Sequence, residues 1–400
     1  MSRSISLAAV TCFAIVLLLL LSPSQALAAS SQNVEAHLVH TNIPMNRKHW
    51  RIVASPNVGN VGSQLTSVAA VTASSIWSVG YYYTPVYATR TLVEYWNGST
   101  WKLVASPDNG TDINQLNGVA AVSANDVWAV GYYRNGHFRT LIEHWDGTQW
   151  SIISSPNLGS GDNQLEAITA FSASDIWAVG TYFTTNPRAN LTLIEHWNGT
   201  NWRVVASPNA PMPINNLTAV EPVTANNVWA VGYSEDGIYQ TLVEHWNGTK
   251  WSVVASPNAM NGNSVLNGLS ILAANDIWAA GNYYDLNLHR DFTLIEHWNG
   301  TQWSIIASPN VGTDFCLLYG IAAISANDVW AVGEDVHVPP HFTLTEHWNG
   351  TQWNIVSSPD PGTTFNSLDA LIAVSGNLWA VGYYYDTQNK AYQTLVELYR

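Results

Sequence analysis

The residues best suited to chemistry lie in one short segment. Glu334 and Asp335 are followed by His337 and His341, so that two carboxylates and two imidazoles fall within eight residues. Such a group could bind a divalent cation or supply acid–base catalysts. The spacing matches no established ligand pattern, and a solvated loop can have the same composition. Metal binding, acid–base chemistry and a solvated loop therefore all stay open for this segment.

A second candidate recurs two residues after the glycine of a repeated Trp-Ala-Val-Gly phrase. Five of the seven copies have tyrosine at that position: Tyr82, Tyr133, Tyr182, Tyr283 and Tyr384. A tyrosine ring can cover the apolar side of a sugar while its hydroxyl stays in water. The same rings could instead pack between neighbouring copies of the repeat. We keep sugar binding and packing as alternatives.

Each copy also has a glutamate in a Thr-Leu-x-Glu phrase. The seven equivalents are Glu94, Glu143, Glu195, Glu244, Glu296, Glu346 and Glu397. Seven identical positions favour a structural hydrogen bond over one catalytic acid. A buried carboxylate needs partners, and with few basic residues available we expect Trp N–H, hydroxyl or backbone donors. The histidine that follows in five copies should point to the opposite face of its strand and pack there.

Composition excludes several partners. Only 10% of the 400 residues are charged, and 28 acidic against 14 basic residues give a net charge of −14. Because phosphate binding needs a basic surface, we expect no nucleic-acid partner. No cofactor motif is present, and we expect no cofactor.

The N-terminus has the pattern of an export signal. A charged start at Arg3, an apolar run from Leu7 to Leu21 and the phrase Ala26-Leu27-Ala28 predict a cleaved signal peptide over residues 1–28. An uncleaved membrane anchor is the alternative, although the run is shorter than the roughly 20 residues that span a bilayer. We therefore expect a secreted protein with a leader at 29–49 and no membrane span once the signal is removed. Its single remaining cysteine, Cys316, would be a buried thiol, with a disulfide between two chains as the alternative.

Everything after the leader is one repeated unit. The Trp of the Trp-Ala-Val-Gly phrase recurs every 49 to 52 residues, at positions 77, 128, 177, 229, 278, 330 and 379. Each copy divides into four short segments rich in Val, Ile, Thr, Tyr and Trp, and none has a helical period. Four antiparallel strands in about 50 residues are typical of a β-propeller blade.

The ends of the array predict how the ring closes. It begins with a lone fourth-strand phrase, Trp50 to Pro56, and it ends with a third-strand phrase, Thr394 to Leu398. Placing the first phrase as the outermost strand of the last blade removes an exposed edge. We therefore predict an all-β, seven-bladed propeller over residues 50–400, closed by its N-terminal strand.

The turns predict two unlike faces. An Asn-Gly or Asp-Gly dipeptide between the third and fourth strands, such as Asn97-Gly98, predicts a two-residue hairpin with positive φ at both residues. These turns and those between strands one and two hardly change among the copies. The loops between strands two and three, and between blades, vary freely. Because binding sites usually lie on loops held by a rigid scaffold, we expect function on the variable face.

By its period and its recurring Tyr and Trp, the chain resembles the kelch and galactose-oxidase-like class of propellers over residues 50–400. It departs from kelch blades, which have two glycines after the second strand where this chain has one, as at Gly131. The phrase is also similar to secreted bacterial propellers of unassigned role, a likeness that implies no activity. A copper radical of the galactose-oxidase kind would require a tyrosine joined to a cysteine, which Cys316 alone does not establish.

The sequence thus predicts a secreted, non-catalytic binding module that recognises a glycan or a cell-surface protein. The alternative is a glycoside hydrolase or lyase with acidic residues at the mouth of the propeller channel. A structural envelope protein is a third possibility, and the oligomeric state is open.

Overall fold

The described residues form an all-β unit. A computed structural model describes residues 48–59, 61–259, 262–311, 315–336 and 340–400. These belong to one compact unit, Arg47–Arg400, whose elements are all strands. No helix in this part of the chain has the length and hydropathy to cross a membrane. The predicted signal peptide (1–28) and nearly all of the predicted leader (29–49) lie outside the described residues.

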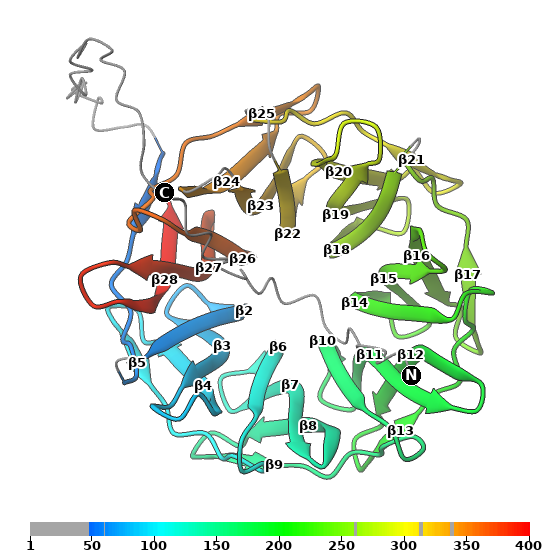
Figure 1. Ribbon diagram of the computed structural model, residues 1–400, viewed down its shortest axis with the longest axis horizontal. Coiled ribbons are helices and arrows are strands. Elements are labelled where there is room, and N and C mark those ends of the chain that lie inside the picture. Colours follow the sequence, from blue (N-terminus) through cyan, green and yellow to red (C-terminus); the bar gives the residue numbers. More distant parts are fainter. Residues whose placement is uncertain (1–47, 60, 260–261, 312–314, 337–339) are drawn as a thin grey trace, which may run out of the picture. The chain divides into compact units, whose positions relative to one another are not determined.

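Twenty-eight strands make seven four-stranded blades (Figure 1). Blade 1 has β2 (Gly62–Thr72), β3 (Ser75–Tyr83), β4 (Thr89–Trp96) and β5 (Trp101–Leu103). Blade 2 has β6 (Asn114–Ser123), β7 (Asp126–Asn135), β8 (His137–Trp145) and β9 (Trp150–Ile152). Blade 3 has β10 (Asn163–Ser172), β11 (Asp175–Thr185), β12 (Arg188–Trp197) and β13 (Trp202–Val204). Blade 4 has β14 (Ile214–Thr224), β15 (Asn227–Glu235), β16 (Tyr239–Trp246) and β17 (Trp251–Val254). Blade 5 has β18 (Gly262–Ala273), β19 (Asp276–Asp285), β20 (Arg290–Trp298) and β21 (Trp303–Ile305). Blade 6 has β22 (Phe315–Ser325), β23 (Asp328–Val336), β24 (His341–Trp348) and β25 (Trp353–Ile355). Blade 7 has β26 (Asn366–Val374), β27 (Asn377–Asp386), β28 (Ala391–Tyr399) and β1 (Trp50–Ile52).

Within each blade, consecutive strands pair antiparallel, and the first strand lies innermost (Figure 1). Two single parallel pairs, Asn190 with Ile214 and Gly62 with Tyr392, link blade 3 to blade 4 and blade 7 to blade 1. Seven buried apolar clusters lie between the blades, and each combines side chains of two neighbours. The hydrophobic core therefore consists of seven clusters arranged in a ring, one in each interface, or seam, between neighbouring blades.

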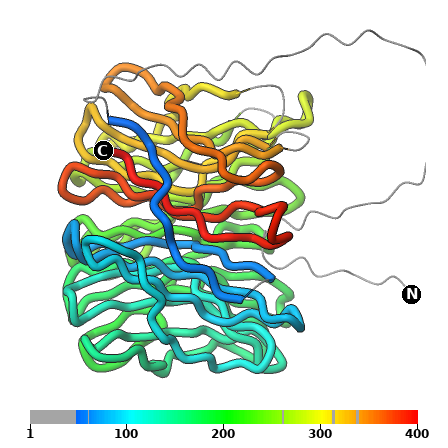
Figure 2. The backbone as a smooth tube through the Cα atoms, turned by 90° about the vertical axis from the view of Figure 1, so that its left-hand side faces the viewer, coloured from blue at the N-terminus to red at the C-terminus, as the bar shows by residue number. Residues whose placement is uncertain are grey.

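The ring closes as predicted. β1 pairs antiparallel with β28, with Trp50 opposite Tyr399, and Figure 2 shows the N-terminal strand (blue) beside the C-terminal one (red). In the seam between blades 6 and 7, the Trp50 ring lies 5.8 Å from Trp330 and 5.4 Å from Tyr399. The other six seams hold the same arrangement with three tryptophans, for example Trp77, Trp145 and Trp150. The surplus strand at one end thus completes the blade that lacks one at the other.

The turns between third and fourth strands differ from the predicted two-residue hairpin. Only the glycine has positive φ, as at Gly98 (92°), and the loop spans four residues between Trp96 and Trp101. The Asn97 Oδ1 accepts hydrogen bonds from the backbone N–H groups of Ser99 and Thr100, both at 3.0 Å. This side-chain turn holds the asparagine outside the left-handed region. The prediction of a hairpin with positive φ at both residues was therefore wrong.

Candidate functional site

The innermost strand of each blade bulges toward the centre of the ring. The pairing of first and second strands skips the residue after a buried leucine, as between Leu65 and Ser67. The skipped residues are Thr66, Asn117, Glu166, Thr218, Asn267, Tyr319 and Asp369. All seven line a central channel of about 330 Å³, built from the first strands of all blades. A bulge redirects a side chain out of the hydrogen-bonded ladder of the two strands. Each blade therefore contributes one bulge residue to the channel lining, and the type of this residue differs between blades.

Four of the seven bulge residues tie neighbouring blades together. Thr66 Oγ1 donates to the Leu116 carbonyl of the next blade at 2.8 Å, and Thr218 Oγ1 does the same to Leu266 at 2.7 Å. The amides of Asn117 and Asn267 donate to the equivalent carbonyls at 2.9 and 2.8 Å. Glu166, Tyr319 and Asp369 are the other three. Glu166 accepts a 2.9 Å hydrogen bond from the Asn117 amide of blade 2, whereas Tyr319 and Asp369 bond within their own blades, to Glu334 and Ser367.

The channel is acidic. Glu166 and Asp369, together with Glu221, line it, and none of its lining residues is Lys, Arg or His. Burial raises the pKa of each of these three carboxyls to about 7. Carboxyl groups with such pKa values exchange protons near neutral pH.

Glu334 lies beside this channel in a network of blade 6. The Tyr319 hydroxyl donates a 2.7 Å hydrogen bond to Glu334 Oε1, and His341 Nδ1 lies 3.6 Å from Glu334 Oε2. The Glu334 side chain is buried, with 2% of its surface exposed. Burial holds the pKa of Tyr319 well above its usual value, so its hydroxyl stays protonated and can donate.

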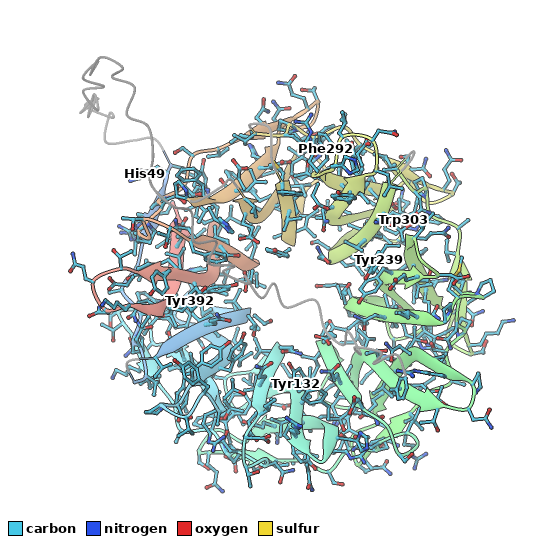
Figure 3. All side chains as sticks on the ribbon, in the orientation of Figure 1. His49, Tyr132, Tyr239, Phe292, Trp303 and Tyr392 are labelled. Carbon is cyan, nitrogen blue, oxygen red and sulfur yellow. The ribbon has the colours of Figure 1, made fainter. Side chains whose placement is uncertain are left out.

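Aromatic rings continue this network into blade 7. The His341 ring lies 4.8 Å from Phe365, which stacks on Tyr383 with centroids 5.2 Å apart. Tyr392, labelled in Figure 3, meets Tyr383 edge-on at 5.5 Å. We call Tyr319, Glu334, His341, Phe365, Asp369, Tyr383 and Tyr392 the aromatic–acidic cluster. Because Phe365, Tyr383 and Tyr392 border the loops before β26 and between β27 and β28, the cluster lies on the variable face.

In blade 6, the side chains of the adjacent residues Glu334 and Asp335 lie on opposite faces of strand β23. Glu334 meets His341, as described, whereas Asp335 points to the opposite face of β23, where its Oδ1 lies 3.8 Å from the buried Cys316 Sγ. Adjacent residues of a strand alternate in this way, so the two carboxylates do not face one shared ion. His337 lies outside the described residues. No cluster of three or more potential metal ligands occurs in the part of the chain that the structure describes.

The five repeated tyrosines pack in the seams. Tyr82, Tyr133, Tyr182, Tyr283 and Tyr384 are each partly buried against an inter-blade apolar cluster. The preceding residue of the same strand, such as Tyr81 or Tyr132, reaches the centre instead, where its hydroxyl bonds a glutamine of the first strand (Gln64 or Gln115). Figure 3 shows Tyr132 at the inner end of blade 2. Sugar stacking by the five stays a prediction.

The repeated glutamates lie in the seams as well. All seven are fully buried, and the hydroxyls of Ser106 and Ser256 donate to Glu143 and Glu296 of the next blade at 2.6 and 2.5 Å. Burial raises the pKa of Glu143 and Glu296 to about 8. At these two positions a serine hydroxyl of the neighbouring blade is the expected neutral donor. The carboxylate oxygens of Glu94, Glu195, Glu346 and Glu397 have no hydrogen-bond partner among the described residues, so the expectation is not met there.

The repeated histidines stack on tryptophan, on the opposite face from the glutamates. His144 stacks on Trp128 at 4.1 Å, and its Nε2 lies 2.9 Å from Asp126 Oδ1. The same oxygen accepts the Trp128 indole N–H at 2.8 Å. These histidines are packing residues of the scaffold.

Tyr319, Phe365, Asp369 and Tyr383 were not among the predicted site residues. For Tyr319, Asp369 and Tyr383 a signal was present in the repeat, because the position after the buried leucine and the one after the Trp-Ala-Val-Gly glycine differ from copy to copy. Phe365 occupies neither position, so the repeat gave no such signal for it.

The fold defines the class of protein, a seven-bladed β-propeller. No family model matches the sequence, and neither does any curated protein. Among solved structures, the chain is similar to YCF48 bound to a D1 peptide, with a TM-score of 0.54 and 15% identity over 89% of this chain and 97% of that one. It is also similar to a GH74 xyloglucanase from Xanthomonas campestris, with a TM-score of 0.52 and 13% identity over 87% of this chain and 55% of the enzyme. A third similar structure, the SapL1 lectin with α-methyl fucoside, has a TM-score of 0.46 and 13% identity over 75% of this chain and 97% of the lectin. At such identities the likeness concerns the fold.

Proposed function

We propose that the protein is a secreted, non-catalytic binding module that recognises a glycan through the aromatic–acidic cluster. The observation that carries the proposal is the convergence of Phe365, Tyr383 and Tyr392 with the carboxylates of Glu334 and Asp369 on the variable face. Aromatic faces cover the apolar side of a sugar ring, and carboxylates and hydroxyls bond its hydroxyl groups.

A cell-surface protein is the alternative ligand. The loops between second and third strands on the same face expose large apolar side chains, among them Val86 (82% exposed), Tyr87 (78%) and Leu288 (58%). Large apolar side chains exposed on one face suit a protein partner. The similar propeller YCF48 has been solved with a peptide bound, which agrees with this alternative as a use of the fold.

A hydrolase is supported by a separate observation. Glu166, Glu221 and Asp369 have pKa values raised to about 7 by burial, which suits a general acid at neutral pH. A propeller hydrolase would need two of the carboxyl groups to face one bond of the substrate.

The test is a glycan array with the mature chain, followed by calorimetry on the best ligand. Phe365→Ala and Tyr383→Ala should each weaken binding roughly tenfold or more, because each removes a stacking ring. Tyr239→Ala is the matched control, since Tyr239 pairs with Tyr233 on the same face of blade 4, away from the cluster. Unchanged affinity in both cluster variants would overturn the proposal.

The number of ligand molecules bound per chain distinguishes binding at the aromatic–acidic cluster from binding at the repeated tyrosines. The cluster predicts one site per chain, whereas sugar stacking by Tyr82 and its four equivalents predicts several similar sites. If the protein turns over a polysaccharide and Glu334→Gln or Asp369→Asn abolishes that turnover, the hydrolase is correct and the binding module is wrong. If the protein shows neither binding nor turnover, the structural envelope protein is the remaining hypothesis. Mass spectrometry of the exported chain, with an N-terminus after Ala28, tests secretion.

A further inference from the structure

The face opposite the aromatic–acidic cluster has a cavity that breaks the repeat. It lies in the seam between blades 7 and 1, next to the closing strand β1, and its volume is about 610 Å³. Its lining includes Arg51, Arg400, Trp96, Trp379, Asn377 and Leu398. This face is otherwise made of the nearly invariant turns, so the cavity is a local feature of the closure.

Two departures from the repeat explain the cavity. In blades 2 to 6 a histidine of the third strand stacks on the second-strand tryptophan, as His144 does on Trp128, and in blade 1 Tyr95 stacks on Trp77 at 4.6 Å. Leu398 occupies this position beside Trp379 in blade 7. Blade 7 also has no direct turn between its third and fourth strands, because β1 comes from the other end of the array. The ring and the turn that fill this place in other blades are therefore both missing.

The cavity is basic in an acidic protein. Arg51 and Arg400 are close enough that burial and the charge of Arg400 lower the pKa of Arg51. The Arg51 Nε is buried and has no hydrogen-bond partner among the described residues. No Asp or Glu lines the cavity, and the ion pairs of other arginines, Arg90 with Asp108 and Arg134 with Asp112, lie on the variable face. Arg400 is exposed and Arg51 is half-buried, so both guanidinium groups can reach an anion in the cavity. The buried Arg51 Nε–H has no acceptor there among the described residues, and an oxyanion would supply one.

We propose that this cavity binds a small oxyanion ligand, a sugar that bears a carboxylate or a sulfate group, through Arg51 and Arg400. The planar guanidinium groups match the geometry of such oxyanions. Trp96, half-buried at the rim, supplies an apolar surface for the sugar ring. The volume falls within the range of about 300–1,000 Å³ that is usual for small-molecule sites. The site is independent of the cluster on the other face.

Calorimetry at constant ionic strength tests the proposal on the mature chain. The probes are glucuronic acid, glucose 6-sulfate, neutral glucose and inorganic sulfate. Glucuronic acid or glucose 6-sulfate should bind and glucose should not. Arg51→Gln and Arg400→Gln should each weaken binding roughly tenfold or more. Binding of inorganic sulfate with equal or greater affinity would overturn the assignment to an anionic sugar.

Arg203→Gln is the matched control. Arg203 has the same place in β13 as Arg51 has in β1, but it lies opposite His196, which fills its seam. Equal weakening by Arg203→Gln would show a general charge effect and overturn the proposal, as would the absence of heat with both anionic sugars.

Leu398→His tests the proposal with a variant that is expected to fold, in case the arginine variants do not. It keeps both arginines and restores the ring found in blade 4, where His245 stacks on Trp229 beside Asn227, the equivalent of Asn377. Binding should be lost while the circular dichroism spectrum and melting temperature are retained. Undiminished binding in a folded Leu398→His variant would mean that the ligand lies elsewhere.

Discussion

At the scale of the residue, Gly131 and its equivalents make the central bulges possible. A Cβ on Gly131 would lie 2.0 Å from the Gln115 carbonyl oxygen, and the equivalent glycines of the other six blades would have the same overlap. The glycine therefore serves the approach of the first strand to the second, which places the bulge residue in the channel. One glycine per blade is enough for this purpose.

Gly131→Ala should lower the free energy of unfolding by about 1–3 kcal/mol, the usual cost of forcing extra volume into a packed site. Gly136→Asn is the control, because Gly136 has open space around it and a φ of 73°, which asparagine tolerates. Urea denaturation measures both. Equal stability of the Gly131→Ala variant and the wild type would contradict the bulge argument.

The buried glutamates make stability depend on pH. Burial raises the folded-state pKa of Glu143 to about 8 from the ordinary glutamate value of 4.5. A raised carboxyl pKa stabilises the fold fully below the unfolded pKa, and this contribution is lost as pH rises through about 8. We expect the melting temperature to fall between pH 5 and pH 9.

Glu143→Gln removes one of these ionisations while keeping a side chain that can accept the Ser106 hydroxyl. Its melting temperature should match that of the wild type near pH 5 and exceed it near pH 9. Thermal melts followed by circular dichroism across this range provide the measurement. Parallel pH profiles would show that Glu143 does not titrate in the expected window.

At the scale of the element, the turn between first and second strands in blades 2 to 6 places an oxygen that is shared between two rings. In blade 4, Asn227 Oδ1 accepts both the Trp229 N–H at 3.0 Å and the His245 Nε2 at 2.8 Å. In blade 2, Asp126 Oδ1 is the corresponding acceptor for the Trp128 N–H and for His144 Nε2. Because a neutral asparagine and a charged aspartate both serve in this position, the turn needs the acceptor oxygen and does not need the negative charge.

Asp126→Asn should therefore change stability little, whereas Asp126→Ala leaves the Trp128 N–H without its acceptor and should cost about 1–3 kcal/mol. Chemical denaturation of the two variants measures the difference. Equal losses would mean that the charge of Asp126, rather than its oxygen, stabilises the turn.

At the scale of the whole molecule, seven similar seams share the packing, and one of them is closed by a strand from the other end of the array. Trp50 is 4% exposed and supplies the third ring of that seam. An edge strand left without its partner exposes backbone groups and apolar surface. The stability of the ring thus depends on a three-residue strand, β1.

Deletion of residues 29–56 should lower the melting temperature markedly and promote aggregation. Trp50→Ala should cost about 3–5 kcal/mol, the usual loss for a buried large aromatic residue. Differential scanning calorimetry of both variants against the mature chain checks this. An unchanged melting temperature after the deletion would contradict closure by strand exchange.

The sequence by itself determined the number of blades, their strands, the closure by the segment at Trp50 and the division into a constant and a variable face. The blades follow from the spacing, because similar units of about 50 residues must bury the same surfaces against one another. The closure follows from the phrases at the two ends of the array, and the two faces follow from comparing the turns and loops of the copies. It also identified Glu334 and His341 as a departure from the repeat, and the structure brings those two together.

The tertiary structure decided which side chains meet. Tyr82 and Tyr81 are adjacent in sequence, yet one packs in a seam and the other reaches the centre, because neighbouring residues of a strand point in opposite directions. Tyr319, Asp369 and Tyr383 come together only when the bulges of separate blades turn toward one axis, and Arg51 reaches Arg400 only when the ring closes. Spacing along one chain determines the strands, whereas contacts between separate blades depend on the register and the bulges of the assembled ring.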